Sequence, residues 1–269
     1  MLNEILVGYD GTKRSEHAAL FAAKLFPRAR FHIVTVVDTR RAGVYYTKMI
    51  WKIMERSSRE AAYKLEKKLE REQVKTRIAI LKGKPSREIL RYSRDHDIST
   101  LVFSTYTKEG IQTLYLGSTV EEVLESSHDK QVLIVKKKVK NPVVKKILLA
   151  TDATKYSKRA ENGALMLASH LGAKLTALYI HPEDTIPSKV QRDMKANIKW
   201  KAEHMGVKTQ LLFLTGKPEE LILEELKKYD MLVMGTGGRG FYHWLIRRKI
   251  GHLAREVIAT SDKPVFLFN

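Results

Sequence analysis

Ile5-Leu6-Val7-Gly8-Tyr9-Asp10-Gly11-Thr12, near the start of the chain, and Ile147-Leu148-Leu149-Ala150-Thr151-Asp152-Ala153-Thr154, halfway along it, are two copies of one pattern. Each copy is an apolar run that ends in an aspartate and a threonine. Further matches occur in the same order in both halves, namely Gly83-Lys84-Pro85 with Gly216-Lys217-Pro218 and Gly117-Ser118 with Gly251-His252. A period of half the chain is too long for a solenoid repeat and indicates a duplicated domain.

Strand and helix patterns alternate through both copies. In the first half, apolar runs predict strands at 4–8, 31–37, 74–81, 101–103 and 132–135, and helical spacing predicts helices at 13–26, 49–70, 85–92 and 119–127. In the second half, the predicted strands are 146–150, 174–180, 207–214, 231–234 and 264–268, and the predicted helices are 156–171, 188–204, 218–228 and 252–260. Met49-Ile50-Trp51 is interpreted as the entry to a core helix.

Most of these strands are continuous apolar runs, which are typical of a parallel sheet covered on both faces. We therefore predict an α/β fold with two tandem domains, at residues 1–137 and 145–269. Each domain is expected to be a five-stranded parallel sheet flanked by helices, of the Rossmann-like kind. A short polar linker joins them.

The composition restricts the chemistry. There is no cysteine, so disulfides, thiolate metal sites and cysteine nucleophiles are excluded. The sequence begins directly with an apolar run and has no stretch long enough to cross a bilayer, so we expect a cytoplasmic protein. The 49 Lys and Arg residues outnumber the 30 Asp and Glu residues, for a formal net charge of +19. Such a charge attracts nucleotides, nucleic acid, acidic lipid headgroups or acidic proteins.

A glycine-bearing loop, Met234-Gly235-Thr236-Gly237-Gly238-Arg239-Gly240, follows the fourth predicted strand of the second half. Gly251 then opens the last predicted helix. Successive backbone N–H groups in such a turn and at a helix start can bind an anion. Because ligands of open parallel sheets bind beyond the carboxyl ends of the strands, Asp152 is expected to face this loop.

With these motifs the chain resembles the universal stress protein (UspA-like) family over nearly its whole length, as a tandem pair of domains. The family pattern is a glycine, two residues, a glycine, nine residues and then Gly-Ser or Gly-Thr, together with an aspartate at the end of the first strand. Members that keep the glycines bind ATP or AMP. The resemblance therefore implies an adenine-nucleotide-binding stress-response switch or adaptor. It also implies that the last strands of the two halves pair, so that the halves form a pseudo-dimer.

The resemblance also implies where the nucleotide lies in the second half. Asp152 and Ile180 would border adenine, and Gly251 with His252 would meet the phosphate tail. The complete set of implied contacts is Ala150, Thr151, Asp152, Ile180, Met234, Gly235, Gly238, Arg239, Gly251, His252 and Leu253. The chain departs from the family pattern in two ways here, because twelve residues separate Gly238 from Gly251 and His252 replaces the usual hydroxyl residue.

In the first half, Ser104 and Thr107 replace both loop glycines, although the Gly117-Ser118 end of the motif is kept. We expect this half to be the weaker site or an empty one. Its implied contacts are Asp10, Val36, Gly117 and Ser118.

Catalysis is not expected. Neither Asp10 nor Asp152 has a second acid, base or nucleophile in a recognisable arrangement, and there is no Walker-type loop or His-x-x-x-His pair. Slow ATP hydrolysis is the weakest alternative. No metal site is expected in the protein itself, and a Mg²⁺ ion is expected only together with ATP.

The stretch Phe241-Tyr242-His243-Trp244-Leu245-Ile246-Arg247-Arg248-Lys249 places aromatic residues before a basic triplet. It is compatible with a membrane-surface or partner patch, with base stacking, with a lid over a nucleotide, or with packing on its own domain or a second subunit. The competing function is a non-nucleotide scaffold that binds a polyanion or membrane surface through the basic face and residues 241–249. A homo-oligomer is also expected.

Overall fold

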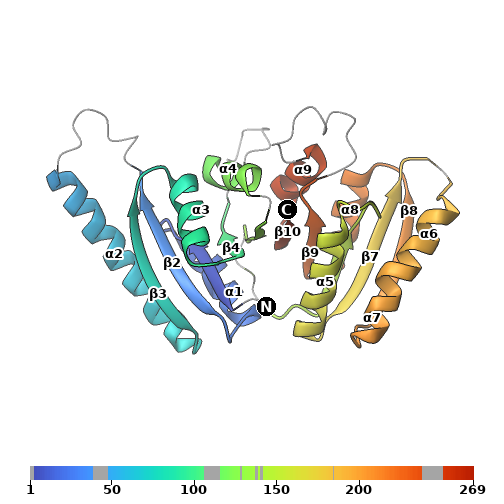
Figure 1. Cartoon of the computed structure of the whole chain (residues 1–269), viewed down its shortest axis with the longest axis horizontal. Helices are drawn as coiled ribbons and strands as arrows, with labels where there is room; N and C mark the ends of the chain where they lie inside the picture. Colours follow the sequence, from blue (N-terminus) through green and yellow to red (C-terminus); the bar gives the residue numbers. More distant parts are fainter. Residues whose placement is uncertain are drawn as a thin grey trace. The chain divides into compact units, whose positions relative to one another are not determined.

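The computed structural model describes residues 3–38, 48–105, 116–127, 129–136, 139, 142–183, 185–237 and 251–269. The elements up to β5 belong to one compact unit, and those from β6 onward belong to a second one. Each unit is an alternation of strands and helices, as the sequence pattern predicts (Figure 1).

The first unit contains five parallel strands in the order β3-β2-β1-β4-β5. The strands are β1 (Glu4–Gly8), β2 (Arg30–Val37), β3 (Lys75–Lys82), β4 (Thr100–Phe103) and β5 (Gln131–Ile134). The helices are α1 (Lys13–Leu25), α2 (Lys48–Arg71), α3 (Pro85–Asp95) and α4 (Ser118–Ser126). Helix α1 packs against α2, and α3 packs against α4. Figure 1 shows α2 and α3 on opposite sides of β2 and β3.

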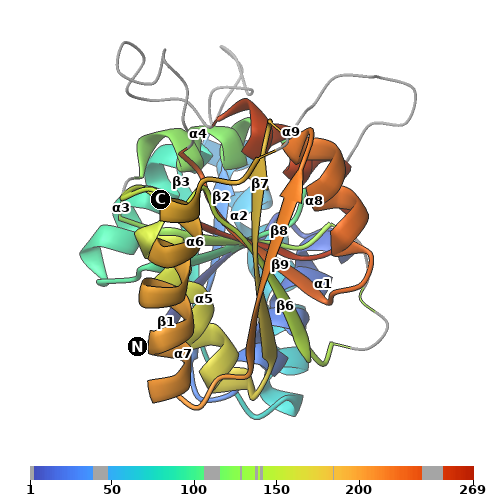
Figure 2. The same ribbon diagram turned by 90° about the vertical axis from the view of Figure 1, so that its right-hand side faces the viewer.

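The second unit repeats this arrangement in the strand order β8-β7-β6-β9-β10, again all parallel. Its strands are β6 (Lys146–Ala150), β7 (Lys174–His181), β8 (Thr209–Thr215), β9 (Met231–Gly235) and β10 (Val265–Phe268). Its helices are α5 (Lys158–Leu171), α6 (Ser188–Met194), α7 (Trp200–His204), α8 (Pro218–Leu226) and α9 (His252–Thr260). Figure 2 shows α6 and α8 on opposite sides of β7 and β8.

The central strands explain why these units fold. Ile5, Leu6, Ile147, Leu148 and Leu149 are completely buried, and both faces of each sheet are covered by helices. Continuous apolar runs are therefore required, because the three middle residues of β1 and of β6 are buried whichever face of the sheet they are on. The predicted strands and helices are all present, with ends that differ by at most three residues.

One predicted helix departs from its regular form. The predicted helix 188–204 is divided, because a π-helical segment at Lys195–Lys199 separates α6 from α7. The Asn197 side chain donates to the backbone carbonyl of Asp193 within this segment, at 2.8 Å. Sequence periodicity does not distinguish a single wide turn from a regular helix, so the segment was not predicted.

The prediction that Met49 and Ile50 enter a core helix is wrong. In α2 only Ala62, Leu65 and Leu69 are buried, whereas Met49 and Ile53 are 72% and 59% exposed. A helix of 24 residues is about 36 Å long, whereas an eight-residue strand is about 26 Å long. The first turns of α2 therefore extend beyond the strands that bury its other end.

Candidate functional site

The candidate site lies at the carboxyl ends of β6 and β9. The chain winds from β6 through β7 to β8 on one side and then returns to place β9 and β10 on the other side of β6. The strand order therefore reverses between β6 and β9, which is where open parallel sheets bind ligands. Ala150 and Met234 are paired neighbours at this point, so the sheet brings the two predicted segments together.

Asp152 forms a tight turn directly after β6. Its Oδ1 accepts hydrogen bonds from the Thr154 backbone N–H at 3.0 Å and from the Thr154 hydroxyl at 2.7 Å. Ala153, between them, has a positive φ of 56°. The second carboxylate oxygen, Oδ2, is buried and has no hydrogen-bond partner in the described part of the chain. The turn therefore fixes the carboxylate and leaves one acceptor unused.

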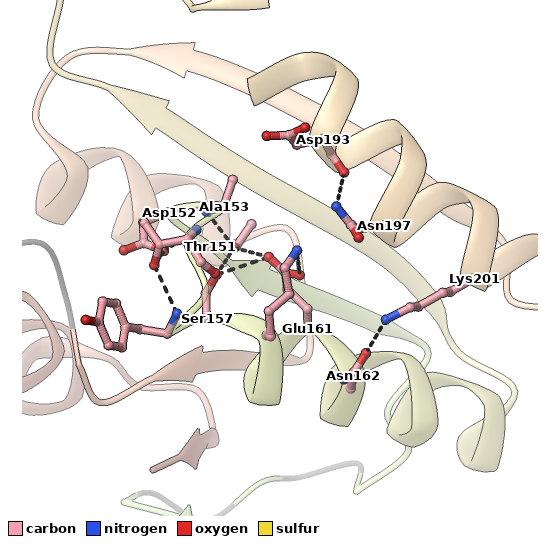
Figure 3. A network of polar contacts seen from close by, with 12 residues as sticks. Thr151, Asp152, Ala153, Ser157, Glu161, Asn162, Asp193, Asn197 and Lys201 are labelled. Atoms are coloured by element: carbon pink, nitrogen blue, oxygen red, sulfur yellow. Dashed lines mark hydrogen bonds and ion pairs between the residues drawn. The ribbon is translucent and has the colours of Figure 1, made fainter. Parts of the chain in front are cut away.

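A buried network of polar side chains connects the turn to α5 (Figure 3). The Thr151 hydroxyl donates to Glu161 Oε1 at 2.8 Å and lies 3.0 Å from the Ser157 hydroxyl. The other carboxylate oxygen of Glu161 pairs with Lys158 Nζ at 2.9 Å. The side chain of Glu161 is only 3% exposed, so a buried charge is compensated within one turn of α5. The Thr151 side chain is thus directed into the protein.

The amino end of α9 is held next to the end of β9. The backbone N–H of Gly251 donates to the carbonyl of Thr236 at 3.1 Å, and the N–H of Thr236 donates to the carbonyl of Phe268 at 3.1 Å. No side chain of the described residues caps α9. In the described residues, the next N–H groups, those of His252, Leu253 and Ala254, have no acceptor. Such an open helix start is suited to an anion.

The remaining predicted residues of this site occupy different environments. Ile180 lies near the end of β7 and is partly exposed, whereas Met234 is 4% exposed and belongs to the core. The His252 side chain is 81% exposed, and its Nδ1 lies 3.5 Å from a carboxylate oxygen of Glu256. Gly238 and Arg239 lie outside the described residues, as does the aromatic and basic stretch 241–249.

The turn of the first unit is built alike but is more completely bonded. Asp10 Oδ1 accepts hydrogen bonds from the Ser15 hydroxyl at 2.6 Å, the Thr12 hydroxyl at 2.7 Å and the Thr12 N–H at 3.0 Å. Burial raises the pKa of Asp10, but these hydrogen bonds together outweigh burial and lower the pKa below its usual 3.8. Gly11 has a φ of 81° at the position of Ala153.

The other predicted residues of the first site belong to two elements, β2 and the start of α4. Val36 is partly exposed near the end of β2, and Gly117, with a φ of 90°, precedes Ser118 at the start of α4. The Phe103 ring at the end of β4 lies against Gly8, where an added Cβ would be 2.4 Å from its Cε1. Thr107 lies outside the described residues.

Sequence reasoning missed Glu161 as part of the second site. The available signal was its place among buried residues of α5, such as Ala160, Ala164 and Leu165, where a carboxylate is unusual. Among the residues that the structure describes, no group of three His, Cys, Asp or Glu side chains could hold a metal ion. No described helix is long and apolar enough to span a membrane.

Comparison with known proteins gives the same family for both units. The model of the universal stress protein family matches residues 1–136 and again residues 144–269. A universal stress protein of Thermus aquaticus is 32% identical over 138 residues, which are 46% of this chain and 97% of that protein. Universal stress protein MJ0531 of Methanocaldococcus jannaschii is 30% identical over 140 residues, 46% of this chain and 81% of that protein.

A crystal structure of a universal stress protein from Archaeoglobus fulgidus matches over 100% of this chain and 97% of its own, with a TM-score of 0.80 and 22% identity. That likeness shows the fold along the full length, whereas the two sequence relatives each match about half of the chain. With two matched copies of the family model, the chain belongs to the universal stress protein family as a tandem member.

Proposed function

We propose that the second unit binds an adenine nucleotide, ATP or AMP, and that the protein acts as a stress-response switch without catalysing a reaction. The observation that carries this proposal is the unused, buried Oδ2 of Asp152 at the end of β6. A buried acceptor without a donor is costly, and an amino or hydroxyl group of a ligand would supply the donor.

The start of α9 supports the same placement. Its unbonded N–H groups, at His252 and Leu253, together with the helix dipole, favour a negatively charged group. Because Gly251 is bonded to Thr236, these N–H groups lie at the carboxyl end of β9, next to β6. A ligand with a donor at one end and a phosphate at the other suits this pair of features, and a nucleotide has both.

A switch requires that the nucleotide bind one conformation more tightly than another. The proposed ligand would connect the Asp152 turn to the start of α9. Binding would therefore stabilise the arrangement in which these two segments are close. A Mg²⁺ ion, where ATP is the ligand, would be held mainly by the phosphates. The cytoplasmic location, the homo-oligomer and the pairing of the last strands stay predictions.

The proposal is tested by titration calorimetry with ATP, AMP and adenosine on three variants. Asp152→Ala removes the unused acceptor, and Asp10→Ala is the matched change in the first unit. We expect Asp152→Ala to abolish nucleotide binding and Asp10→Ala to leave it nearly unchanged. His252→Asp adds an exposed negative charge at the start of α9, where an acid stabilises the helix.

His252→Asp separates loss of binding from loss of folding. It should weaken ATP binding more than adenosine binding, while thermal unfolding changes little, because the gain from an acid in the first turn of α9 is offset by repulsion from Glu256 four residues on. The proposal fails if the parent protein binds no nucleotide at millimolar concentration. It also fails if the two aspartate variants lose binding equally.

A further inference from the structure

A basic groove lies in the first unit between α1 and α2. It is an open groove of about 470 Å³, a volume within the range of small-ligand sites. The turn between β1 and α1 and one face of α2 line it. The charged residues of its wall are Glu16, Glu60, Lys64, Lys67, Lys68 and Arg71.

Both carboxylates of this wall already have cationic partners. Glu16 Oε1 accepts from Lys68 Nζ at 2.6 Å, and this bond connects α1 to α2. Glu60 Oε1 accepts from Arg56 Nε at 3.0 Å. In the described part of the chain, Lys64, Lys67 and Arg71 have no ion-pair partner. Among the residues described, the groove therefore has three positive charges without an ion-pair partner and no such negative charge.

The spacing of these three cations keeps them together. Lys64, Lys67 and Arg71 are three and four residues apart, so they lie on one face of α2 over about 10 Å of its length. Like charges at this spacing repel one another and destabilise a helix. A cation in the last turn, such as Arg71, is favoured by the helix dipole, but Lys64 lies too early in α2 for that explanation.

The second unit lacks this arrangement. The corresponding helices of the two units are both followed by a residue with a positive φ, Gln73 at 61° and Gly206 at 66°. We align the two helices on these residues. Trp200, Lys201 and His204 then stand at the positions of Lys67, Lys68 and Arg71. Lys201 keeps the connection between helices, donating to Asn162 Oδ1 at 2.9 Å (Figure 3).

At the other two positions the second unit has the aromatic rings of Trp200 and His204 in place of Lys67 and Arg71. The centroids of these two rings lie 4.0 Å apart. The connection between helices is therefore common to both units. The additional cations at Lys67 and Arg71 belong to the first unit alone.

The geometry points to this groove as a binding site for a small anion with two or more phosphoryl groups, such as inorganic tripolyphosphate or the phosphate chain of a nucleotide. Lysine ammonium groups bind phosphates as point charges and an arginine guanidinium binds them through a planar fork, so a row of two lysines and one arginine suits consecutive phosphoryl groups. The volume of this open groove suits a small ligand rather than a nucleic acid duplex. Bound phosphate would relieve the repulsion within α2.

The test is titration calorimetry with tripolyphosphate at low ionic strength. The groove variant carries Lys64→Gln, Lys67→Gln and Arg71→Gln. The matched control carries Arg87→Gln, Arg94→Gln and Lys227→Gln, which removes the same charge from exposed positions outside the groove. We expect the groove variant to bind about tenfold more weakly, the scale of three exposed charge contacts, and the control to bind like the parent. Thermal unfolding of the groove variant should change little, because the repulsion removed offsets the loss of Arg71 from the last turn of α2.

Further titrations distinguish the sources of the phosphate. Orthophosphate should bind more weakly than tripolyphosphate, and a nucleotide bound through its phosphates should compete with it. The same titrations with His252→Asp exclude a contribution from the start of α9, so this result is independent of the proposed nucleotide site. Equal tripolyphosphate affinity in the groove variant and the parent overturns the inference. The inference is also overturned if the control variant loses as much tripolyphosphate affinity as the groove variant. It is overturned as well if the parent protein binds duplex DNA but not tripolyphosphate.

Discussion

The ring of Phe103 occupies the space that a side chain at Gly8 would need. A Cβ placed on Gly8 would lie 2.4 Å from Phe103 Cε1, and Phe103 is 4% exposed. The strands β1 and β4 place these two residues side by side. In the second unit, the same two positions are taken by Ala150 and Met234. The two copies therefore fill the same space with a glycine and a large ring, or with a methyl group and a flexible side chain.

This relationship predicts a dependence between two substitutions. Gly8→Ala alone should destabilise the first unit by about 1–3 kcal/mol, because overpacking forces the buried ring to move. Gly8→Ala together with Phe103→Met reproduces the pair of the second unit and should recover much of that loss. The coupling is measured by a double-mutant cycle from urea unfolding midpoints. Additive effects of the two substitutions would contradict it.

The turns after β1 and β6 differ in conformational strain. Gly11 adopts its φ of 81° without a steric penalty, whereas Ala153 holds a φ of 56° with a Cβ present. The left-handed conformation costs a non-glycine residue roughly 1–2 kcal/mol. A glycine avoids that cost, but it also increases the entropy of the unfolded chain, which cancels part of the gain in stability. Ala153→Gly should therefore increase the free energy of unfolding by up to about 1 kcal/mol, which raises the urea midpoint. Gly11→Ala should lower it. A lower midpoint for Ala153→Gly would refute the assignment of strain.

The sequence pattern was sufficient for the architecture, and the predicted site segments after β6 and β9 are neighbours through Ala150 and Met234, although their role as a binding site stays a prediction. Buried strands must be apolar along their whole length, and the repetition of Asp10 as Asp152 aligned the two halves. It was not sufficient for contacts between distant residues. Nothing local to Gly8 reveals that Phe103 fills its space, and the pattern around Ile53 is that of a buried helix face although the side chain is exposed. Those properties depend on where elements end in space.

Two lysine–glutamate pairs of identical spacing provide a test of burial. Lys158 and Glu161 lie 2.9 Å apart with side-chain exposures of 35% and 3%, and Lys217 and Glu220 lie 2.9 Å apart with exposures of 72% and 68%. Lys158→Ala leaves a buried carboxylate without its cation and should cost about 1–3 kcal/mol of unfolding free energy. Lys217→Ala should cost about 0.5 kcal/mol or less. Equal costs would show that the buried network compensates Glu161 without Lys158.

His32 links stability to pH from a buried position on β2. Its Nε2 lies 2.7 Å from a Glu4 carboxylate oxygen, and its Nδ1 lies 2.9 Å from the Tyr92 hydroxyl. Burial lowers the pKa of His32, the hydrogen bond and charge of Glu4 raise it, and the charges of His96 and Arg77 lower it, with a net decrease from 6.5.

The folded protein therefore keeps His32 neutral at a pH where the unfolded chain binds a proton. Its contribution to stability is present above about pH 6.5 and is lost as the pH falls from there through the lower pKa of the folded state. The urea midpoint should decrease between about pH 7.5 and 5.5, and this decrease should be smaller in His32→Gln. The exposed His252→Gln serves as the control and should follow the parent. A parent midpoint that rises on acidification would mean that the pairing with Glu4 outweighs burial.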